Sequence, residues 1–288
     1  MRRPSPSRRK NPRIRRLGQH FLNDPGILNK IVRVIDPQPE DRIIEVGAGK
    51  GALTFPLAQK AGEVIAIEKD GELIPVLQSK KPANLTIIEK DVLRVDFREL
   101  LAAGEGVPGT AKLVGNLPYS ISTPLMFKVL KNKGLFEKCI FLVQKEVAER
   151  ICARPGSKKY APLSILVEND FSARVHFIVR AGSFSPPPQV ESALISLAKR
   201  PAPLYQVSDE RLFLEFLQAA FRQRRKILLN NLRNSGWPPE AAQAAFRDLG
   251  LDGTARPEEL TIAQFVRLFE FSGSISKYVI SKRRRNRP

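Results

Sequence analysis

The sequence predicts a doubly wound, Rossmann-like α/β domain followed by a small all-helical domain. Between residues 42 and 143, short apolar segments typical of strands alternate with segments of helical periodicity. A glycine-rich segment directly follows the first of these strands, and beyond residue 207 the apolar spacing is helical throughout. At 288 residues, the chain is long enough for one large and one small domain.

A helix is expected over residues 25–35, because its apolar residues recur at helical spacing and Asp24 can cap its first turn. Alternating strands and helices then follow at 42–46, 52–61, 64–67, 71–79, 85–88, 97–103, 113–114, 124–131 and 140–143. We expect a helix from Glu146, another at 163–167, and two closing strands at 173–179 and 193–197. The last two are close enough in sequence to pair antiparallel.

Two prolines and a loss of periodicity at 199–207 indicate a domain boundary. The first domain is therefore predicted at 17–200 and the helical domain at 207–281, with basic tails at 1–16 and 282–288. In the helical domain an apolar stripe runs from Leu212 to Phe221, and further helices are expected at 240–249 and 263–271.

The charge of the chain indicates a polyanionic partner. Lys and Arg number 48 against 29 Asp and Glu, which gives a net charge of +19. Residues 1–16 carry eight of the basic residues and residues 282–288 carry five, with no acidic residue in either tail. The tails are therefore interpreted either as solubilising segments or as segments that bind phosphate groups.

The composition also limits the location of the protein. No run of about 18 apolar residues is present, and no apolar stretch follows the basic N-terminus, so neither a membrane span nor a secretory signal is expected. Cys139 and Cys152, the only cysteines, fit neither a disulfide framework nor a zinc site. We expect a monomeric cytoplasmic protein without a metal.

The glycine-rich segment predicts a nucleoside cofactor. Gly47 and Gly49 follow the first strand and allow the backbone to approach a ligand closely. Glu68 ends the second strand, where a carboxylate can accept hydrogen bonds from ribose hydroxyls, and Asp91 follows the third strand, where it could contact the adenine amine. The glycines and Glu68 fit NAD and S-adenosylmethionine alike, whereas the position of Asp91 is more typical of methyltransferases. The alternative for both acids is a solvated strand end.

The segment Asn116-Leu117-Pro118-Tyr119 favours methyl transfer to an aromatic amine. The lone pair of such an amine is delocalised into the ring, so a catalyst must hold its N–H hydrogens with acceptors that favour a pyramidal nitrogen. The Asn116 side-chain oxygen and the backbone carbonyl of Leu117 can act as these acceptors. Tyr119 offers a face on which an extruded base can stack. The alternative is an ordinary turn that follows a strand.

At this point the sequence closely resembles the bacterial small-subunit (16S) ribosomal RNA adenine N6,N6-dimethyltransferases. The resemblance covers nearly the whole chain. It rests on the segments LGQHFLND (17–24), EVGAGKGALT (45–54), GNLPYSISTPLMF (115–127), QKEVAER (144–150), FSPPPQVESA (184–193) and FRQRRKILLNNL (221–232). It implies that S-adenosylmethionine donates methyl groups to N6 of two adjacent adenosines, each twice, in a 3′-terminal hairpin loop of the RNA during small-subunit assembly.

The resemblance also implies roles for individual residues. The cofactor site would be lined by His20, Leu22, Gly47, Glu68, Asp91 and Asn116. Phe184 would face the target base opposite Tyr119, or alternatively would anchor a loop to the core. Some family members have Asn in place of His20 and Ser120, so the contact that His20 makes stays open between side chain and backbone. The basic run Arg222, Arg224, Arg225 and Lys226 is predicted to bind RNA phosphates.

Three other functions are less consistent with the sequence. A large-subunit rRNA methyltransferase of the antibiotic-resistance kind shares the glycine loop, but 184–193 and 221–232 argue against it. A ribosome-assembly factor that acts mainly by binding would not need Asn116 to Tyr119. An NAD-dependent oxidoreductase explains neither that segment nor the basic tails.

Overall fold

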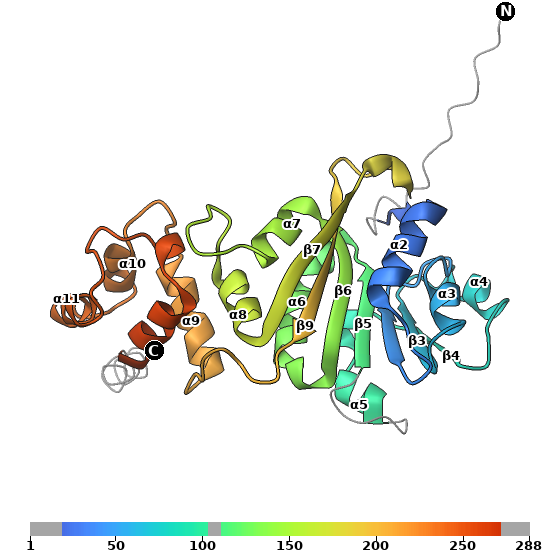
Figure 1. The fold of residues 1–288 in the computed structure, drawn as a ribbon, viewed down its shortest axis with the longest axis horizontal. Helices are drawn as coiled ribbons and strands as arrows, with labels where there is room; N and C mark the ends of the chain where they lie inside the picture. Colours follow the sequence, from blue (N-terminus) through green and yellow to red (C-terminus); the bar gives the residue numbers. More distant parts are fainter. Residues whose placement is uncertain (1–18, 103–110, 272–288) are drawn as a thin grey trace, which may run out of the picture. The chain divides into compact units, whose positions relative to one another are not determined.

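The computed structural model describes residues 19–102 and 111–271 (Figure 1), so the predicted tails 1–16 and 282–288 lie outside it. Its contacts divide the chain into two compact units. Unit 1 contains residues up to 148 and residues 174–199, and unit 2 contains residues 149–173 and those from 200 onward. This division differs from the predicted boundary, which placed 149–173 in the first domain. The reason is packing, because Tyr160 and Ile165 are buried in one cluster with Phe213 and Phe265.

Unit 1 is built on a seven-stranded sheet with the strand order β4-β3-β2-β5-β6-β9-β7. Its strands are β2 (Arg42–Val46), β3 (Glu63–Glu68), β4 (Leu85–Glu89), β5 (Ala111–Asn116), β6 (Phe136–Gln144), β7 (Phe171–Val179) and β9 (Ser192–Lys199). The first five pair in parallel, and β9 pairs antiparallel with β6. The carboxyl ends of β2, β3, β4 and β5 therefore meet along one edge of the sheet.

Helices cover the sheet because its strands are apolar on both faces. They are α2 (Pro25–Ile35), α3 (Thr54–Ala58), α4 (Ile74–Gln78), α5 (Phe97–Ala102), α6 (Ser122–Lys131) and the first residues of α7 (Lys145–Ile151). Figure 1 shows α2 in front of the sheet. There Ile31 and Ile35 join Ile43 and Val114 in one core cluster, whereas the buried Leu125 of α6 lies outside this cluster. Alternate strand residues thus serve two layers of helices.

The prediction of alternating strands and helices is confirmed, although several bounds differ and one small sheet was not predicted. The strands β5 and β6 are longer than the predicted strands at 113–114 and 140–143. The helices after β2 and β3 are shorter than predicted, because glycine-containing turns occupy their first residues. A second sheet, formed by β1 (Phe21–Leu22) and β8 (Phe184–Ser185), was not predicted. Strands of two residues have no periodicity to detect, and these two are far apart in the chain.

Among the residues of unit 2 that the structure describes, the regular elements are helices apart from the first residues of β7. Its helices are the end of α7, α8 (Pro162–Asp170), α9 (Glu210–Ala220), α10 (Leu228–Asn234), α11 (Pro239–Asp248) and a helix at 262–271. The predicted stripe of α9 is confirmed, since Phe213, Phe216 and Leu217 are buried. They pack in a core rich in aromatic rings, in which Phe213 and Phe269 meet edge to face.

Within the described ranges, no helix combines the length and the apolar character that crossing a bilayer requires.

Candidate active site

The glycine loop connects β2 to α3 and is held by Glu68. Gly47, Gly49 and Gly51 all have positive φ angles of 59° to 83°, which side chains disfavour. Glu68 is only 5% exposed. One of its carboxylate oxygens accepts from the Gly49 amide at 2.8 Å, and the other accepts from the amides of Lys69 and Asp70, each at 2.8 Å. The end of β3 thereby fixes the position of the loop.

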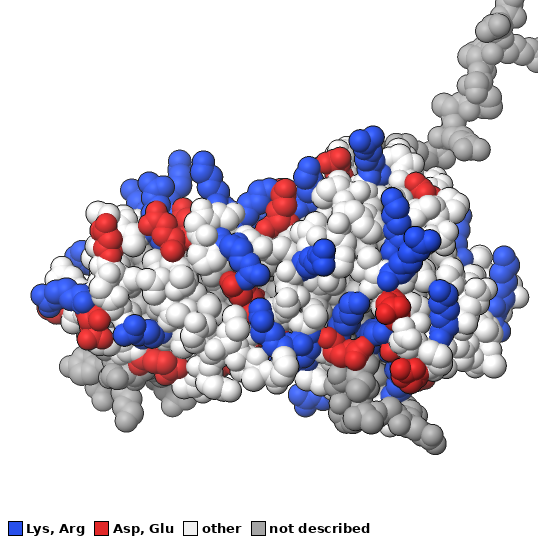
Figure 2. Space-filling view, in the orientation of Figure 1, with Lys and Arg blue, Asp and Glu red and all other residues white. Residues whose placement is uncertain are grey.

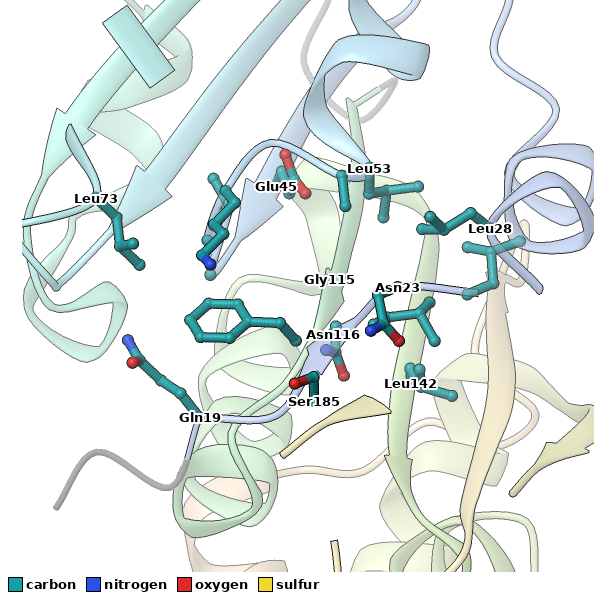
Figure 3. Close-up of a pocket in the computed structure, with 18 of the residues that line it drawn as sticks. Gln19, Asn23, Leu28, Glu45, Leu53, Leu73, Gly115, Asn116, Leu142 and Ser185 are labelled. Atoms are coloured by element: carbon teal, nitrogen blue, oxygen red, sulfur yellow. The ribbon is translucent and has the colours of Figure 1, made fainter. Parts of the chain in front are cut away.

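A cavity of about 600 Å³ opens beside this loop, which is large enough for a nucleoside cofactor. Figure 3 shows Glu45 on one side of it and Asn116 and Ser185 on the opposite side, with Leu28 and Leu53 lining one end. Gly115 also borders the cavity. A Cβ atom there would lie 2.4 Å from the Val46 carbonyl oxygen, so only glycine lets β5 approach β2 this closely.

Glu45 is a charged group that the sequence did not assign to a role. It is 2% exposed and lines the cavity, and its Oε2 atom has no hydrogen-bond partner. Burial, opposed in part by the Thr54 hydroxyl, raises the pKa of Glu45 to about 7. The carboxyl group is therefore near its titration point at neutral pH and can gain from a hydrogen-bond donor or a cation in the cavity.

A smaller hollow of about 170 Å³ adjoins the glycine loop and contains Asp91. Asp91 forms an ion pair with Lys69 at 2.8 Å and accepts from the Leu93 amide at 3.0 Å. The Lys69 ammonium, together with the Leu93 amide, lowers the pKa of Asp91. The structure thus brings the predicted Asp91 and Glu68 to one pocket, which Gly47 also lines.

Asn116 is the last residue of β5 and its side chain is oriented by a backbone contact. Its Nδ2 atom donates to the carbonyl oxygen of His20 at 2.9 Å. This bond determines which end of the amide is the acceptor, so Oδ1 is left to accept from a ligand. Leu117 is buried, and its amide donates to the Leu142 carbonyl at 3.0 Å, which fixes the turn after β5.

Tyr119 and His20 lie against each other, with ring centroids 5.5 Å apart and an interplanar angle of 31°. The Tyr119 hydroxyl also forms a 3.0 Å hydrogen bond with the Ser192 hydroxyl. Burial raises the pKa of Tyr119 despite this bond. The His20 ring contacts the Pro186 carbonyl at 2.7 Å, and because a carbonyl only accepts, Nδ1 must carry the proton. The His20 backbone therefore orients Asn116 while its ring packs beside Tyr119.

Phe184, which was predicted either to face a target base or to anchor a loop, is buried in this structure. It is 4% exposed and belongs to the hydrophobic core of unit 1, and in the small sheet it pairs with Leu22, which lines the cavity. A side chain this buried offers no open face to a base. The structure instead supports the alternative that Phe184 anchors its loop to the core.

The segment 19–23 borders both hollows and a third one of about 60 Å³, which Asn116, Leu117 and Tyr119 also line. Gln19 donates to Asp70 at 3.2 Å, and the Lys50 ammonium lies 5.2 Å from the Phe21 ring centroid. The Phe21 ring is also close to Gly49, where a Cβ atom would come within 3.3 Å of it. Periodicity does not indicate that this segment lines a site. Only the resemblance of LGQHFLND (17–24) to the family indicated it.

The predicted RNA-binding residues lie in unit 2, in the turn between α9 and α10. All four side chains are exposed. Arg224 differs from the others, because its guanidinium donates to the carbonyl oxygens of Lys158 and Tyr160. Figure 2 shows Lys and Arg side chains on the surface of both units, with Asp and Glu between some of them.

Among residues 19–102 and 111–271, no group of three or more His, Cys, Asp or Glu side chains is placed to hold a metal ion.

Comparison with known proteins identifies the family. The sequence model of the family described as "Ribosomal RNA adenine dimethylase" matches residues 10–273. The "Ribosomal RNA small subunit methyltransferase A" of Pseudomonas fluorescens is 41% identical over 256 residues, which are 88% of this chain and 92% of the relative. The protein of the same name from Geobacter metallireducens is 40% identical, again over 88% of this chain and 92% of the relative.

Solved structures agree in fold. A dimethyladenosine transferase from Plasmodium falciparum is similar with a TM-score of 0.75 and 25% identity, over 89% of this chain and 98% of that one. The 23S rRNA methyltransferase ErmE is similar with a TM-score of 0.67 and 23% identity, over 87% of this chain and 98% of that one, which shows a shared fold alone. The match of the family model over nearly the whole described chain, together with relatives about 40% identical, shows that this chain belongs to the ribosomal RNA adenine dimethylase family.

Proposed function

We propose that the chain methylates the N6 amine of adenine in small-subunit ribosomal RNA, with S-adenosylmethionine as the methyl donor. The target is two adjacent adenosines in the 3′-terminal hairpin loop, and each receives two methyl groups during assembly of the small subunit. The observation that carries the proposal is the orientation of Asn116. Its Nδ2 atom is bonded to the His20 carbonyl, so its Oδ1 atom is available at the edge of the cavity.

Asn116 would act on the amine by accepting one of its N–H hydrogens. An acceptor on one side of the nitrogen favours a pyramidal geometry and so directs the lone pair toward the methyl group. The Leu117 carbonyl would accept from the second N–H. Transfer would break the bond between sulfur and the methyl carbon and form the N–C bond, and the amine would lose a proton to solvent. Tyr119 would support the base from one side, although its ring already lies against His20.

The residues of the cavity fit the methyl donor. S-adenosylmethionine supplies an electrophilic methyl group on sulfur, together with an adenosine and an amino-acid end. Glu45, with its unpartnered oxygen, would bind the ammonium group at the amino-acid end. Gly47, Gly49 and Leu22 would line the space beside it, and Asp91 would contact the adenine amine.

Glu68 would accept from a ribose hydroxyl, with a restriction that its contacts impose. A carboxylate has about four acceptor positions. Three backbone amides occupy Glu68 here, so one position remains for the ribose. Glu68 would therefore serve both the glycine loop and the cofactor.

The proposal is tested by incubating the protein with radiolabelled S-adenosylmethionine and small ribosomal subunits whose RNA lacks methyl groups. The modified nucleotides are then mapped. We expect label in N6,N6-dimethyladenosine at two adjacent positions near the 3′ end. Label in large-subunit RNA alone, or binding of subunits without any label, would contradict the proposal.

A further inference from the structure

The turn between α9 and α10 is held rigid from inside unit 2. Asn231, on α10, is 2% exposed. Its amide nitrogen donates to the carbonyls of Ala220 at 2.8 Å and Gln223 at 3.1 Å, at the start and in the middle of the turn. The Lys226 amide closes the turn on the Gln223 carbonyl at 2.9 Å. The basic side chains of this turn therefore project from a fixed backbone.

A second segment, the loop 156–160, is joined to this turn. Arg224 donates from its guanidinium to the carbonyls of Lys158 and Tyr160, the latter at 2.8 Å. The rings of Tyr160 and Phe221 meet edge to face at 6.4 Å. The loop is also anchored where the Gly156 amide donates to the Glu258 carbonyl at 2.7 Å. Residues more than 60 positions apart in the chain thus form one surface.

Among the described residues, some of the cations on this surface are paired with carboxylates, and others are not. Two basic side chains near the loop have carboxylate partners, because Lys159 pairs with Glu149 and Arg154 pairs with Glu168. Lys158, Arg222, Arg225 and Lys226 are exposed and form no ion pair within the described part of the chain. Gathering unpaired like charges costs free energy unless an anion neutralises them.

We propose that this surface is a single preorganised site for the phosphate groups of RNA, to which Lys158 contributes together with Arg222, Arg225 and Lys226. Arg224 is a positioning residue, since both of its observed contacts are to backbone carbonyls of the loop. The inference rests on the proposed function for the identity of the polyanion. Its new content is that the loop 156–160 is part of the RNA-binding surface and that Arg224 places it there.

The arrangement of the cations indicates that this surface binds the sugar–phosphate backbone of RNA. The four exposed cations belong to two segments whose backbones are held in place, and contacts of cations with phosphates would position the RNA without specifying sequence. Each phosphate that is neutralised releases counterions and adds about 0.7–0.9 to the slope of log affinity against log salt.

The test measures binding of the full-length chain to transcribed small-subunit rRNA across a range of KCl concentrations. Lys158→Gln should lower the slope by about 0.7–0.9, as Arg225→Gln should. The matched control is Lys159→Gln, which removes the same charge from the next residue. Because Lys159 is already paired with Glu149, the slope for this variant should stay that of the wild type. Equal slopes for Lys158→Gln and Lys159→Gln would overturn the proposal.

Arg224 is tested through its coupling to Lys158. In an Arg224→Gln background, Lys158→Gln should cause little further loss of affinity, because the hydrogen bond that holds the Lys158 carbonyl in place is then absent. Additive losses would show that Arg224 does not position Lys158. Circular dichroism establishes that each variant is folded, and Arg224→Lys, which keeps the charge, should show the same weakened coupling.

Failure of this inference can be told apart from failure of the proposed function. All variants are also assayed for methyl transfer at low salt with saturating RNA. Normal methylation with equal slopes for Lys158→Gln and Lys159→Gln would overturn the proposed RNA-binding surface. It would leave the proposed methyltransferase activity unaffected. If Lys158→Gln lowered the affinity for an acidic polypeptide and left the affinity for RNA unchanged, RNA would not be the partner of this surface.

Discussion

The glycine loop of unit 1 and the basic turn of unit 2 are each held by a buried side chain that forms hydrogen bonds with the backbone, but they present different surfaces. In unit 1 the buried carboxylate of Glu68 accepts from three backbone amides, and in unit 2 the buried amide of Asn231 donates to two backbone carbonyls. The loop of unit 1 borders a cavity, whereas the turn of unit 2 bears exposed cations. The first suits a small molecule, and the second suits an extended polyanion.

In both units a buried polar side chain, Glu68 or Asn231, holds the backbone of a binding segment in place. A loop that is already ordered loses little conformational entropy on binding. Changing residues in each unit separately should therefore have separable effects, on cofactor binding and catalysis in unit 1 and on salt-dependent RNA affinity in unit 2.

The largest effect on stability is expected from the core beneath the active site. Phe184→Ala should lower the free energy of unfolding by about 3–5 kcal/mol, because it leaves a cavity where a buried ring was. Denaturant unfolding measures this loss. Val190→Ala, at an exposed position in the same region, should cost less than about 0.5 kcal/mol. A loss of that smaller size for Phe184→Ala would show that the ring is not anchored in the core.

Glu68→Ala isolates the role of the buried carboxylate at the glycine loop. Removing the acceptor leaves backbone donors and a ribose hydroxyl unpaired, so affinity for S-adenosylmethionine should fall by about 1–3 kcal/mol. Calorimetric titration measures the change. Glu89→Ala is the matched control, because Glu89 pairs in register with Glu68 at the same edge of the sheet but is exposed. Equal affinities for the two variants would make Glu68 an ordinary strand-end acid.

Glu45 should make both stability and cofactor affinity depend on pH. Burial raises its pKa from the ordinary 4.5 to about 7, so the folded state binds more protons than the unfolded state between these values. The stability contributed by this group is therefore complete below about pH 4.5 and is lost as pH rises to about 7. Glu45→Gln should accordingly be more stable than the wild type at pH 8, and this advantage should shrink toward pH 5.

The affinity for S-adenosylmethionine should rise with pH, whereas the stability contributed by Glu45 falls. An ionised Glu45 binds the cofactor ammonium better than a neutral one, so wild-type affinity should rise with pH by up to about tenfold per unit below the pKa. Titrations from pH 5.5 to 8 in the wild type and in Glu45→Gln check this. Parallel pH profiles for the two proteins would exclude Glu45 as the partner of the ammonium group.

The smallest effect is expected from Tyr119→Phe, which keeps the ring and removes one hydrogen bond to Ser192. The loss in stability should be about 0.5–1.5 kcal/mol. Ser192→Ala should cost a similar amount, and the double variant should lose less than the sum, since one interaction links the two. Additive losses would show that the bond does not stabilise the native state.

Much of unit 1 could be predicted from sequence because its strands are continuous apolar runs that end in diagnostic residues. Asn116, Glu68 and the glycines were found this way, and the parallel topology places them at one edge. Their hydrogen bonds could not be predicted, because they depend on side-chain rotation. Glu45 was missed because a carboxyl inside an apolar strand gives no periodic signal, and its environment depends on α3 and Thr54.

Unit 2 was less predictable for a related reason. The stripe of α9 identified its core-facing residues, but nothing in the spacing of residues 149–173 connects them to helices 40 positions later. Their assignment depends on where Tyr160 is buried, and on Arg224, whose carbonyl partners are distant in the chain. From charge alone, Arg224 was predicted to bind RNA together with the other basic residues of the turn. In the structure its guanidinium instead donates to backbone carbonyls.

In the proposed mechanism, the oriented amide of Asn116 holds the target amine during methyl transfer. It is tested most directly by single-turnover methylation of unmethylated small subunits with Asn116→Ala, resolving monomethyl and dimethyl products. We predict a rate about 10²–10³ lower than that of the wild type, with RNA affinity nearly unchanged and monomethyladenosine accumulating. A wild-type rate and a wild-type product ratio for Asn116→Ala would show that Asn116 does not hold the amine during transfer.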